Sequence, residues 1–216
     1  MKISHIKFSL LLSFYLISIS FVFSQSTITP QSALKSYLQN GDQTYQWELK
    51  DSIELGGVKG YHLLLTSQKW REYTWRHQLT VFVPGEIKYD GAMLFISGGS
   101  NKDEQPNWSK TDGLWASLAG ISNKNKAIVA LIKQVPNQPL YGNLTEDALI
   151  SYTLHQFKQN KDYSFPLLFP MVKSAVKAMD AVQEFTKLKA NVMVNNFVVT
   201  GASKRGWTTW LTAAID

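Results

Sequence analysis

The sequence predicts an α/β protein whose sheet is mostly parallel and carries helices on both faces. Two short runs, residues 92–96 and 127–132, are apolar at every position, a third, residues 196–200, has an apolar centre, and helical patterns separate them. Continuous apolar strands that alternate with helices are typical of parallel strands buried on both faces. Of the 216 residues 44% are hydrophobic, which is enough for one sizeable core.

The first part of the chain predicts a short helix followed by an antiparallel pair of strands. Pro30 suits the first turn of a helix, where no N–H donor is needed, and apolar residues at helical spacing continue to Leu38. Residues 62–66 are apolar almost throughout, and residues 77–83 alternate. The aromatic-rich segment 67–76 between them is predicted to be a hairpin region.

The strand–helix units follow. Four helices are predicted here, over residues 112–121, from residue 145, over 171–185 and over 207–215. Thr145 is suited to cap the second of them, because its hydroxyl can accept from a free N–H group. Glu146 and Asp147 would then lie in the first turn, where the helix dipole favours anions.

The amino-terminal residues have the pattern of a signal peptide. Lys2 and Lys7 precede an apolar stretch from Phe8 to Phe23, and Ser24 supplies a small residue at the break. The stretch is shorter than the roughly 18 residues expected of a membrane span, although an uncleaved anchor is the alternative. We therefore expect residues 1–24 to be a signal peptide. The protein would be secreted or periplasmic, with no stable membrane span after cleavage.

Composition excludes several classes of function. The chain has no cysteine, so disulfides, thiol catalysis and thiolate zinc sites are excluded. The net charge is +6, but basic residues alternate with acids and form no nucleic-acid stripe. No nucleotide loop is present, and the loose calcium-like spacing in residues 101–107 lacks the required glycine and closing glutamate. We expect no cofactor, no metal and no nucleic-acid partner.

The candidate chemistry lies in residues 197–207, where a buried strand runs into a Gly-x-Ser turn and a helix follows at once. In a nucleophile elbow this arrangement lifts a serine hydroxyl above the carboxyl ends of the strands. Ser203 is the candidate nucleophile, and Gly201 and Gly206 are the small residues that would let strand and helix approach. The usual second glycine lies two positions after the serine. Arg205 stands there instead, and this departure weakens the short motif.

A serine nucleophile also needs N–H donors for its oxyanion. The amide of Lys204 is one candidate donor, and Gly99, in a glycine loop at residues 97–100 after an apolar strand, supplies the other. Gly-x-Ser is common by chance, and a Gly-Gly pair also fits an ordinary turn. Their combination, at matching places in one architecture, favours an α/β-hydrolase-type fold that is truncated after the nucleophile elbow.

The segment TGASKRGWTTW, residues 200–210, resembles the PhoPQ-activated pathogenicity-related protein family. FISGGSN at residues 95–101, and VPNQPL followed by TEDALISYT, support the resemblance. It implies an exported α/β-hydrolase with Ser203 as nucleophile and with acid and histidine partners farther along a longer chain. It also implies a link to bacterial virulence regulation and resistance to host peptides.

The pattern Gly-x-Ser-x-x-Gly is similar to the elbow of glucuronoyl esterases, in which a basic residue follows the serine. Two alternatives follow for Lys204 and Arg205. They place positive charge near an acidic substrate or the oxyanion, or they are partly solvated or pair with a carboxylate of the fold. The second alternative is favoured, since exposed basic side chains mostly have such structural roles.

The triad order in this fold is serine, acid, histidine. Only 13 residues follow Ser203; Asp216 is their one acid, and none is a histidine. His62 and His77, in early strands, are better explained as ordinary strand residues. We therefore expect residues 25–216 to be the amino-terminal portion of a longer hydrolase domain, inactive alone, whose ester, amide or peptide substrate is unknown.

The alternative function is a non-catalytic secreted protein that binds or signals to a partner through a hydrolase scaffold. The missing acid and histidine motivate it, together with Trp70, Trp75 and Trp108 in predicted loops. Such aromatic residues more often pack in cores or hairpins than at interfaces.

Overall fold

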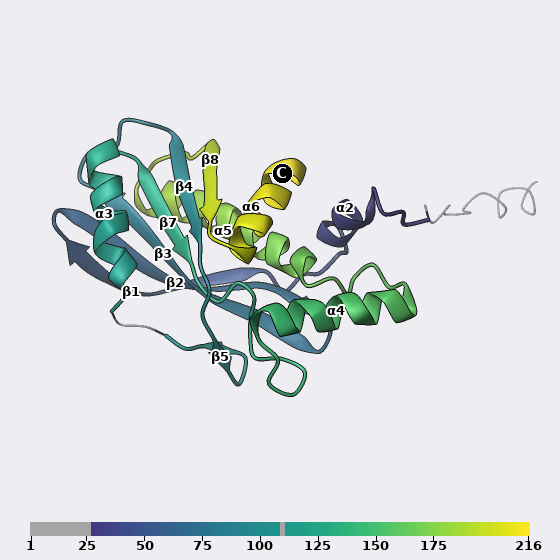
Figure 1. Cartoon of the computed structure of the whole chain (residues 1–216). Coiled ribbons are helices and arrows are strands. Elements are labelled where there is room, and N and C mark those ends of the chain that lie inside the picture. Colours follow the sequence, from purple (N-terminus) through teal and green to yellow (C-terminus); the bar gives the residue numbers. More distant parts are fainter. Residues whose placement is uncertain (1–26, 109–110) are drawn as a thin grey trace, which may run out of the picture.

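The structure is a computed structural model that describes residues 27–108 and 111–216 (Figure 1). The predicted signal peptide, residues 1–24, lies outside the described residues. The strands are β1 (Gln46–Leu55), β2 (Val58–Trp70), β3 (Tyr73–Pro84), β4 (Gly91–Ile96), β5 (Asn101–Lys102), β6 (Gln105–Pro106), β7 (Ile128–Ile132) and β8 (Asn196–Gly201). The helices are α2 (Ala33–Leu38), α3 (Gly113–Asn125), α4 (Glu146–Asn160), α5 (Leu168–Lys189) and α6 (Lys204–Ile215).

The central sheet is mixed, which corrects the expectation of a mostly parallel one. Its six strands have the order β1-β2-β3-β7-β4-β8. The pairings β1–β2, β2–β3 and β3–β7 are antiparallel, and only β7–β4 and β4–β8 are parallel. The apolar runs coincide with the parallel strands, but β2 and β3 bury more of their residues than β4 does, although they pair as a hairpin. The third run, β8, was predicted to be buried, yet it lies at the edge of the sheet and has no buried residue.

The β2–β3 hairpin is longer than the sequence pattern indicated. The segment predicted as a hairpin region is mostly strand, and only Arg71 and Glu72 separate the two strands. Trp70 and Trp75 are 2% and 0% exposed, and their ring centroids lie 5.8 Å apart. Both tryptophans therefore stabilise the core, and neither is available as a loop residue for binding a partner.

Helices cover both faces of the sheet, as expected. Figure 1 shows α3 on one face and α5 on the other. On the α3 face Trp115 and Leu118 pack with Val58, Phe82 and Val129 of the strands. On the opposite face α5 contributes the buried stripe that its sequence predicts, and α6 packs beside it. No helix in residues 27–108 and 111–216 is long and apolar enough to cross a bilayer.

Three loops leave the sheet at the carboxyl ends of its parallel strands. Because β7, β4 and β8 run parallel, their carboxyl ends meet at the same edge, where ligands bind in open α/β sheets. Ile96 at the end of β4 is in register with Ile132 on one side and Gly201 on the other. The glycine loop, the loop after β7 and the serine turn therefore leave the sheet side by side. The loop after β7 leads into α4.

Candidate active site

Ser203 occupies a strained turn between β8 and α6. Its backbone angles are φ 57° and ψ −125°, a combination that residues other than glycine rarely adopt. Two hydrogen bonds close the turn, from the Arg205 N–H to the Ala202 carbonyl at 3.0 Å and from the Trp207 N–H to the Ser203 carbonyl at 3.1 Å. Strain of this kind costs about 1–3 kcal/mol and is concentrated at functional sites. The turn presents Ser203 at the first residue before a helix, as in a nucleophile elbow.

The two elbow glycines are needed for a close approach of strand and helix. A Cβ atom on Gly201 would lie 2.9 Å from both the Cβ and the carbonyl oxygen of Arg205. A Cβ atom on Gly206 would lie 3.1 Å from the Gly201 carbonyl oxygen. Gly206 thus meets the strand although it stands one residue later than usual, while Arg205 lies over Gly201. The unusual spacing leaves the tight turn intact.

The glycine loop after β4 is held against the loop after β7. The Val135 N–H donates to the Ser97 carbonyl and the Gln134 N–H to the Gly98 carbonyl, both at 3.1 Å. Gly99 has φ 147°, and a Cβ atom there would lie 3.1 Å from Gln134 Nε2 and 3.2 Å from its backbone nitrogen. Any larger residue at position 99 would be strained and would displace Gln134.

Gly98 joins the glycine loop to the elbow, a role that sequence reasoning missed. A Cβ atom at Gly98 would lie 2.5 Å from Nη2 and 2.9 Å from Cζ of Arg205. The guanidinium therefore packs directly on the loop backbone, and its Nε donates to the Val135 carbonyl at 2.6 Å. The predicted oxyanion loop and the predicted serine turn are brought together through Arg205.

One carboxylate, that of Glu146, pairs with both basic residues of the elbow. Arg205 binds it in a bidentate fashion, Nη2 to Oε1 at 2.7 Å and Nη1 to Oε2 at 2.9 Å. Lys204 Nζ lies 2.6 Å from Oε2, and Gln138 Nε2 donates to Oε1 at 2.6 Å. We call Gln138, Glu146, Lys204 and Arg205 the Glu146 cluster. It supports the second alternative for the basic residues, pairing with a carboxylate of the fold.

The charges of the Glu146 cluster shift one another's protonation. The hydrogen bond from Arg205, opposed by burial and reinforced by Lys204 and Gln138, lowers the pKa of Glu146 to about 2. The hydrogen bond to Glu146 raises the pKa of Lys204. Lys204 therefore stays a paired cation, and its side chain is not a candidate proton donor or acceptor. Its backbone, at the first position of α6, begins the turn whose N–H groups have no partner within the helix.

The sequence placed Glu146 correctly but assigned it only part of its role. Glu146 is in the first turn of α4, as predicted, and it also binds the elbow across a sequence separation of 59 residues. Thr145 occupies the N-cap position, yet its side chain makes no capping hydrogen bond. The Gln138 amide instead binds the start of the helix, because its oxygen accepts from the Glu146 N–H at 2.8 Å.

Comparisons with known proteins identify the family of the chain. The family model described as PhoPQ-activated pathogenicity-related protein matches residues 34–216. The chain belongs to this family. A curated relative, autocrine proliferation repressor protein A of Dictyostelium discoideum, is 36% identical over an alignment of 194 positions, which covers 85% of this chain and 38% of the relative. The chain thus spans well under half the length of that relative.

The fold of this family member is similar to that of a solved structure. A protein from Bacteroides fragilis assigned as an acetyl xylan esterase aligns with a TM-score of 0.56 and 13% identity, over 86% of this chain and 49% of that one. An acetyl xylan esterase from Paenibacillus sp. R4 aligns with a TM-score of 0.48 and 12% identity, over 88% and 57%. The first similarity shows that this part of the family protein shares the fold of that neighbour.

Two histidines of this family member, His62 and His77, have structural roles. His77 is fully buried, with Nε2 2.9 Å from Ser67 Oγ and Nδ1 3.0 Å from the Lys133 carbonyl oxygen, and burial lowers its pKa to about 4. His62 Nδ1 lies 2.9 Å from Thr80 Oγ1, and its ring centroid lies 4.6 Å from that of Trp115 in α3. Their hydrogen-bond partners belong to the core, which agrees with their interpretation as strand residues.

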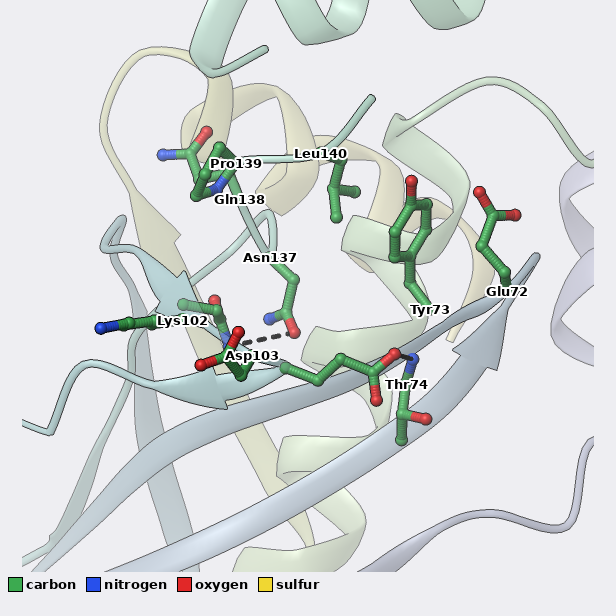
Figure 2. A pocket seen from close by; sticks show the side chains of 11 residues that line it. Glu72, Tyr73, Thr74, Lys102, Asp103, Asn137, Gln138, Pro139 and Leu140 are labelled. Carbon is green, nitrogen blue, oxygen red and sulfur yellow. Dashed lines mark hydrogen bonds between the residues drawn. The ribbon is translucent and has the colours of Figure 1, made fainter. Parts of the chain in front are cut away.

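Two hollows open near this edge of the sheet. The first, of about 460 Å³, includes Ser203 and is bounded by residues of α4 and α6. The second, of about 500 Å³, lies between the start of β3, the β5–β6 hairpin and the loop after β7 (Figure 2). There Glu104 accepts from the Thr74 N–H at 2.9 Å. Gln138 lines the second hollow and also belongs to the Glu146 cluster. Among the described residues no three metal-ligating side chains gather.

Proposed function

We propose that the protein is an exported serine hydrolase that acts on carboxylic esters, with Ser203 as its nucleophile. The observation that carries this proposal is the backbone of Ser203, held at φ 57° and ψ −125° between a parallel strand and a helix. Nothing in the packing of an ordinary strand–helix connection requires such strain, whereas a nucleophile elbow does. The esterase fold of the Bacteroides fragilis neighbour supports an ester as the substrate class.

In the proposed mechanism each candidate residue at the carboxyl ends of the parallel strands has a role. Ser203 Oγ attacks the ester carbonyl carbon, and a general base takes the hydroxyl proton. The backbone N–H groups of Lys204 and Gly99 donate to the oxyanion, and the positive end of the α6 dipole adds to this stabilisation. Because the Lys204 ammonium is paired with Glu146 and Asp147, the amide of that residue and not its ammonium acts on the oxyanion. Gly201 and Gly206 keep the turn tight.

The acid and the histidine of the triad would come from the part of the longer family proteins that follows Ser203, in the order that this fold uses. The relative from Dictyostelium discoideum is long enough to supply them, since the match covers only 38% of it. Export rests on the predicted leader, residues 1–24. A link to virulence or to resistance against host peptides rests on family membership alone.

Labelling with a fluorophosphonate tests the proposal on the full-length protein. We expect the Ser203→Ala variant to lose all labelling. Ser151 lines the same hollow and is exposed, so Ser151→Ala is a matched control that should keep full labelling. Persistent labelling of Ser203→Ala would place the nucleophile elsewhere. A native protein that takes no label would favour the non-catalytic alternative, a secreted binding protein on a hydrolase scaffold.

A further inference from the structure

The hollow beside Ser203 has an apolar wall. Ile150 and Leu154 of α4 and Trp207 of α6 line it, together with Ser203 itself. Leu154 is 43% exposed and Trp207 is 50% exposed, although both are large apolar side chains. Apolar side chains left open around a concave site with a few polar groups are typical of ligand contacts.

The charged groups at the rim of this hollow are already satisfied by one another. Lys204 Nζ lies 2.6 Å from Glu146 and 3.0 Å from Asp147, and its side chain is only 11% exposed. The Asp147 side chain is 91% exposed and therefore hydrated. A ligand group in the hollow meets no unpaired cation from these residues, so the apolar wall determines what binds there.

We propose that this hollow receives the acyl chain of the ester and that Leu154 and Trp207 determine the preferred chain length. The inference rests on the proposed function. When Ser203 Oγ bonds to the acyl carbon, the bond from that carbon to the alcohol oxygen breaks, and the alcohol leaves with the proton. The acyl chain stays attached to the serine that lines the hollow. The alcohol, in contrast, has to depart.

A series of p-nitrophenyl esters on the full-length protein measures the inference directly, because the alcohol is constant while the acyl chain grows from acetate to butyrate to hexanoate. Each methylene buried in the hollow raises kcat/KM about fourfold. Leu154→Trp fills the hollow, and we expect it to lower the ratio of hexanoate to acetate kcat/KM at least tenfold. Leu154→Ala removes part of the wall and lowers the same ratio by a smaller factor.

Leu188 is the matched control, because it is 70% exposed near the end of α5 and does not line the hollow. Leu188→Ala should leave the hexanoate to acetate ratio at its native value. An unchanged ratio in Leu154→Trp, in protein that still labels at Ser203, would overturn the assignment of the hollow while the proposed nucleophile stands.

The alcohol side needs its own series, with acetate esters of ethanol, butanol and hexanol. If Leu154→Trp changes selectivity in this series and not in the acyl series, the acyl assignment is wrong. Labelling keeps the two failures apart, since a protein without Ser203-dependent labelling contradicts the proposed function itself.

Discussion

Replacing Glu146 with glutamine removes the carboxylate that two nearly buried cations share. The side chains of Lys204 and Arg205 are 11% and 12% exposed, and each lies within 3 Å of the Glu146 carboxylate. Glutamine has the same size and can still accept one hydrogen bond, so packing is kept. Arg205, however, loses the carboxylate that it binds, and Lys204 keeps only the exposed carboxylate of Asp147 at 3.0 Å.

The cost follows from the burial of the three side chains. Breaking a buried ion pair by removal of one partner costs about 3–5 kcal/mol, because the other charge is left uncompensated. The Glu146 side chain is 38% exposed, so water can replace part of what is lost. We therefore expect a loss of about 3 kcal/mol in the free energy of unfolding for Glu146→Gln, at the lower end of that range.

Asp147 offers a matched control one residue away. Its side chain is 91% exposed and approaches Lys204 at 3.0 Å, so Asp147→Asn should cost roughly 0–1 kcal/mol. Urea unfolding of the two variants and the native protein gives the comparison. If Glu146→Gln costs no more than Asp147→Asn, the Glu146 cluster does not hold the elbow and the reasoning is refuted.

The difference in unfolding free energy between the native protein and Glu146→Gln should depend on pH. The pKa of Glu146 is lowered from 4.5 to about 2, so the stabilisation is fully present above pH 4.5 and is lost as the pH falls toward 2. Glu146→Gln carries no titrating group at this position. The difference in unfolding free energy between native protein and variant should therefore shrink across that window, and a constant difference would contradict the assignment.

Three further predictions concern the elbow, the core and a buried charge. Gly201→Ala introduces a contact of 2.9 Å with the α6 backbone, so it should lower the free energy of unfolding by about 1–3 kcal/mol and abolish labelling of Ser203. Gly120→Ala is the control: a Cβ atom there, in helix α3, has nothing within 4 Å, and this variant should be more stable by up to about 1 kcal/mol. The pKa of His77 is lowered from 6.5 to about 4, so the free energy of unfolding falls by about 3 kcal/mol as the pH drops through that window. Across the same window the melting temperature of His77→Gln should change less with pH than that of the native protein. Lys173→Ala removes the counter-charge of the nearly buried Asp42, which keeps hydrogen bonds from Thr44 and the Lys69 N–H, and should cost about 3 kcal/mol in urea unfolding. Lys177→Ala, whose ion pair is more exposed, should cost less than about 1 kcal/mol.

The parallel strands and the serine turn could be predicted because their signals are local. Residues 92–96 and 127–132 are apolar at nearly every position, which only strands buried on both faces require. The turn at Ser203 is marked by small residues on both sides of the serine. The strand β1, in contrast, was missed. It lies at the edge of the sheet, most of its residues are exposed, and an irregularity between Leu49 and Asp51 interrupts its alternation.

The Glu146 cluster could not be predicted, because its members are distant in sequence. Arg205 and Glu146 are separated by 59 residues, and nothing in either local pattern points to the other. Arg205 was interpreted as a departure from the usual glycine of the motif. The structure gives the departure a physical reason, since the guanidinium needs that position to reach Glu146 and to pack on Gly98.

The contact between Gly98 and Arg205 has an evolutionary consequence. The side chain of Arg205 contacts three segments that mutate independently: the glycine loop, the start of α4 and the elbow. A change at position 98, 146 or 205 alone therefore disturbs the contacts of the other two residues. A side chain at position 98 would collide with the guanidinium, and loss of the carboxylate at position 146 would leave the guanidinium charge without its carboxylate partner. Family members that replace Arg205 should therefore also have changed Glu146, and only they are free to carry a larger residue in place of Gly98.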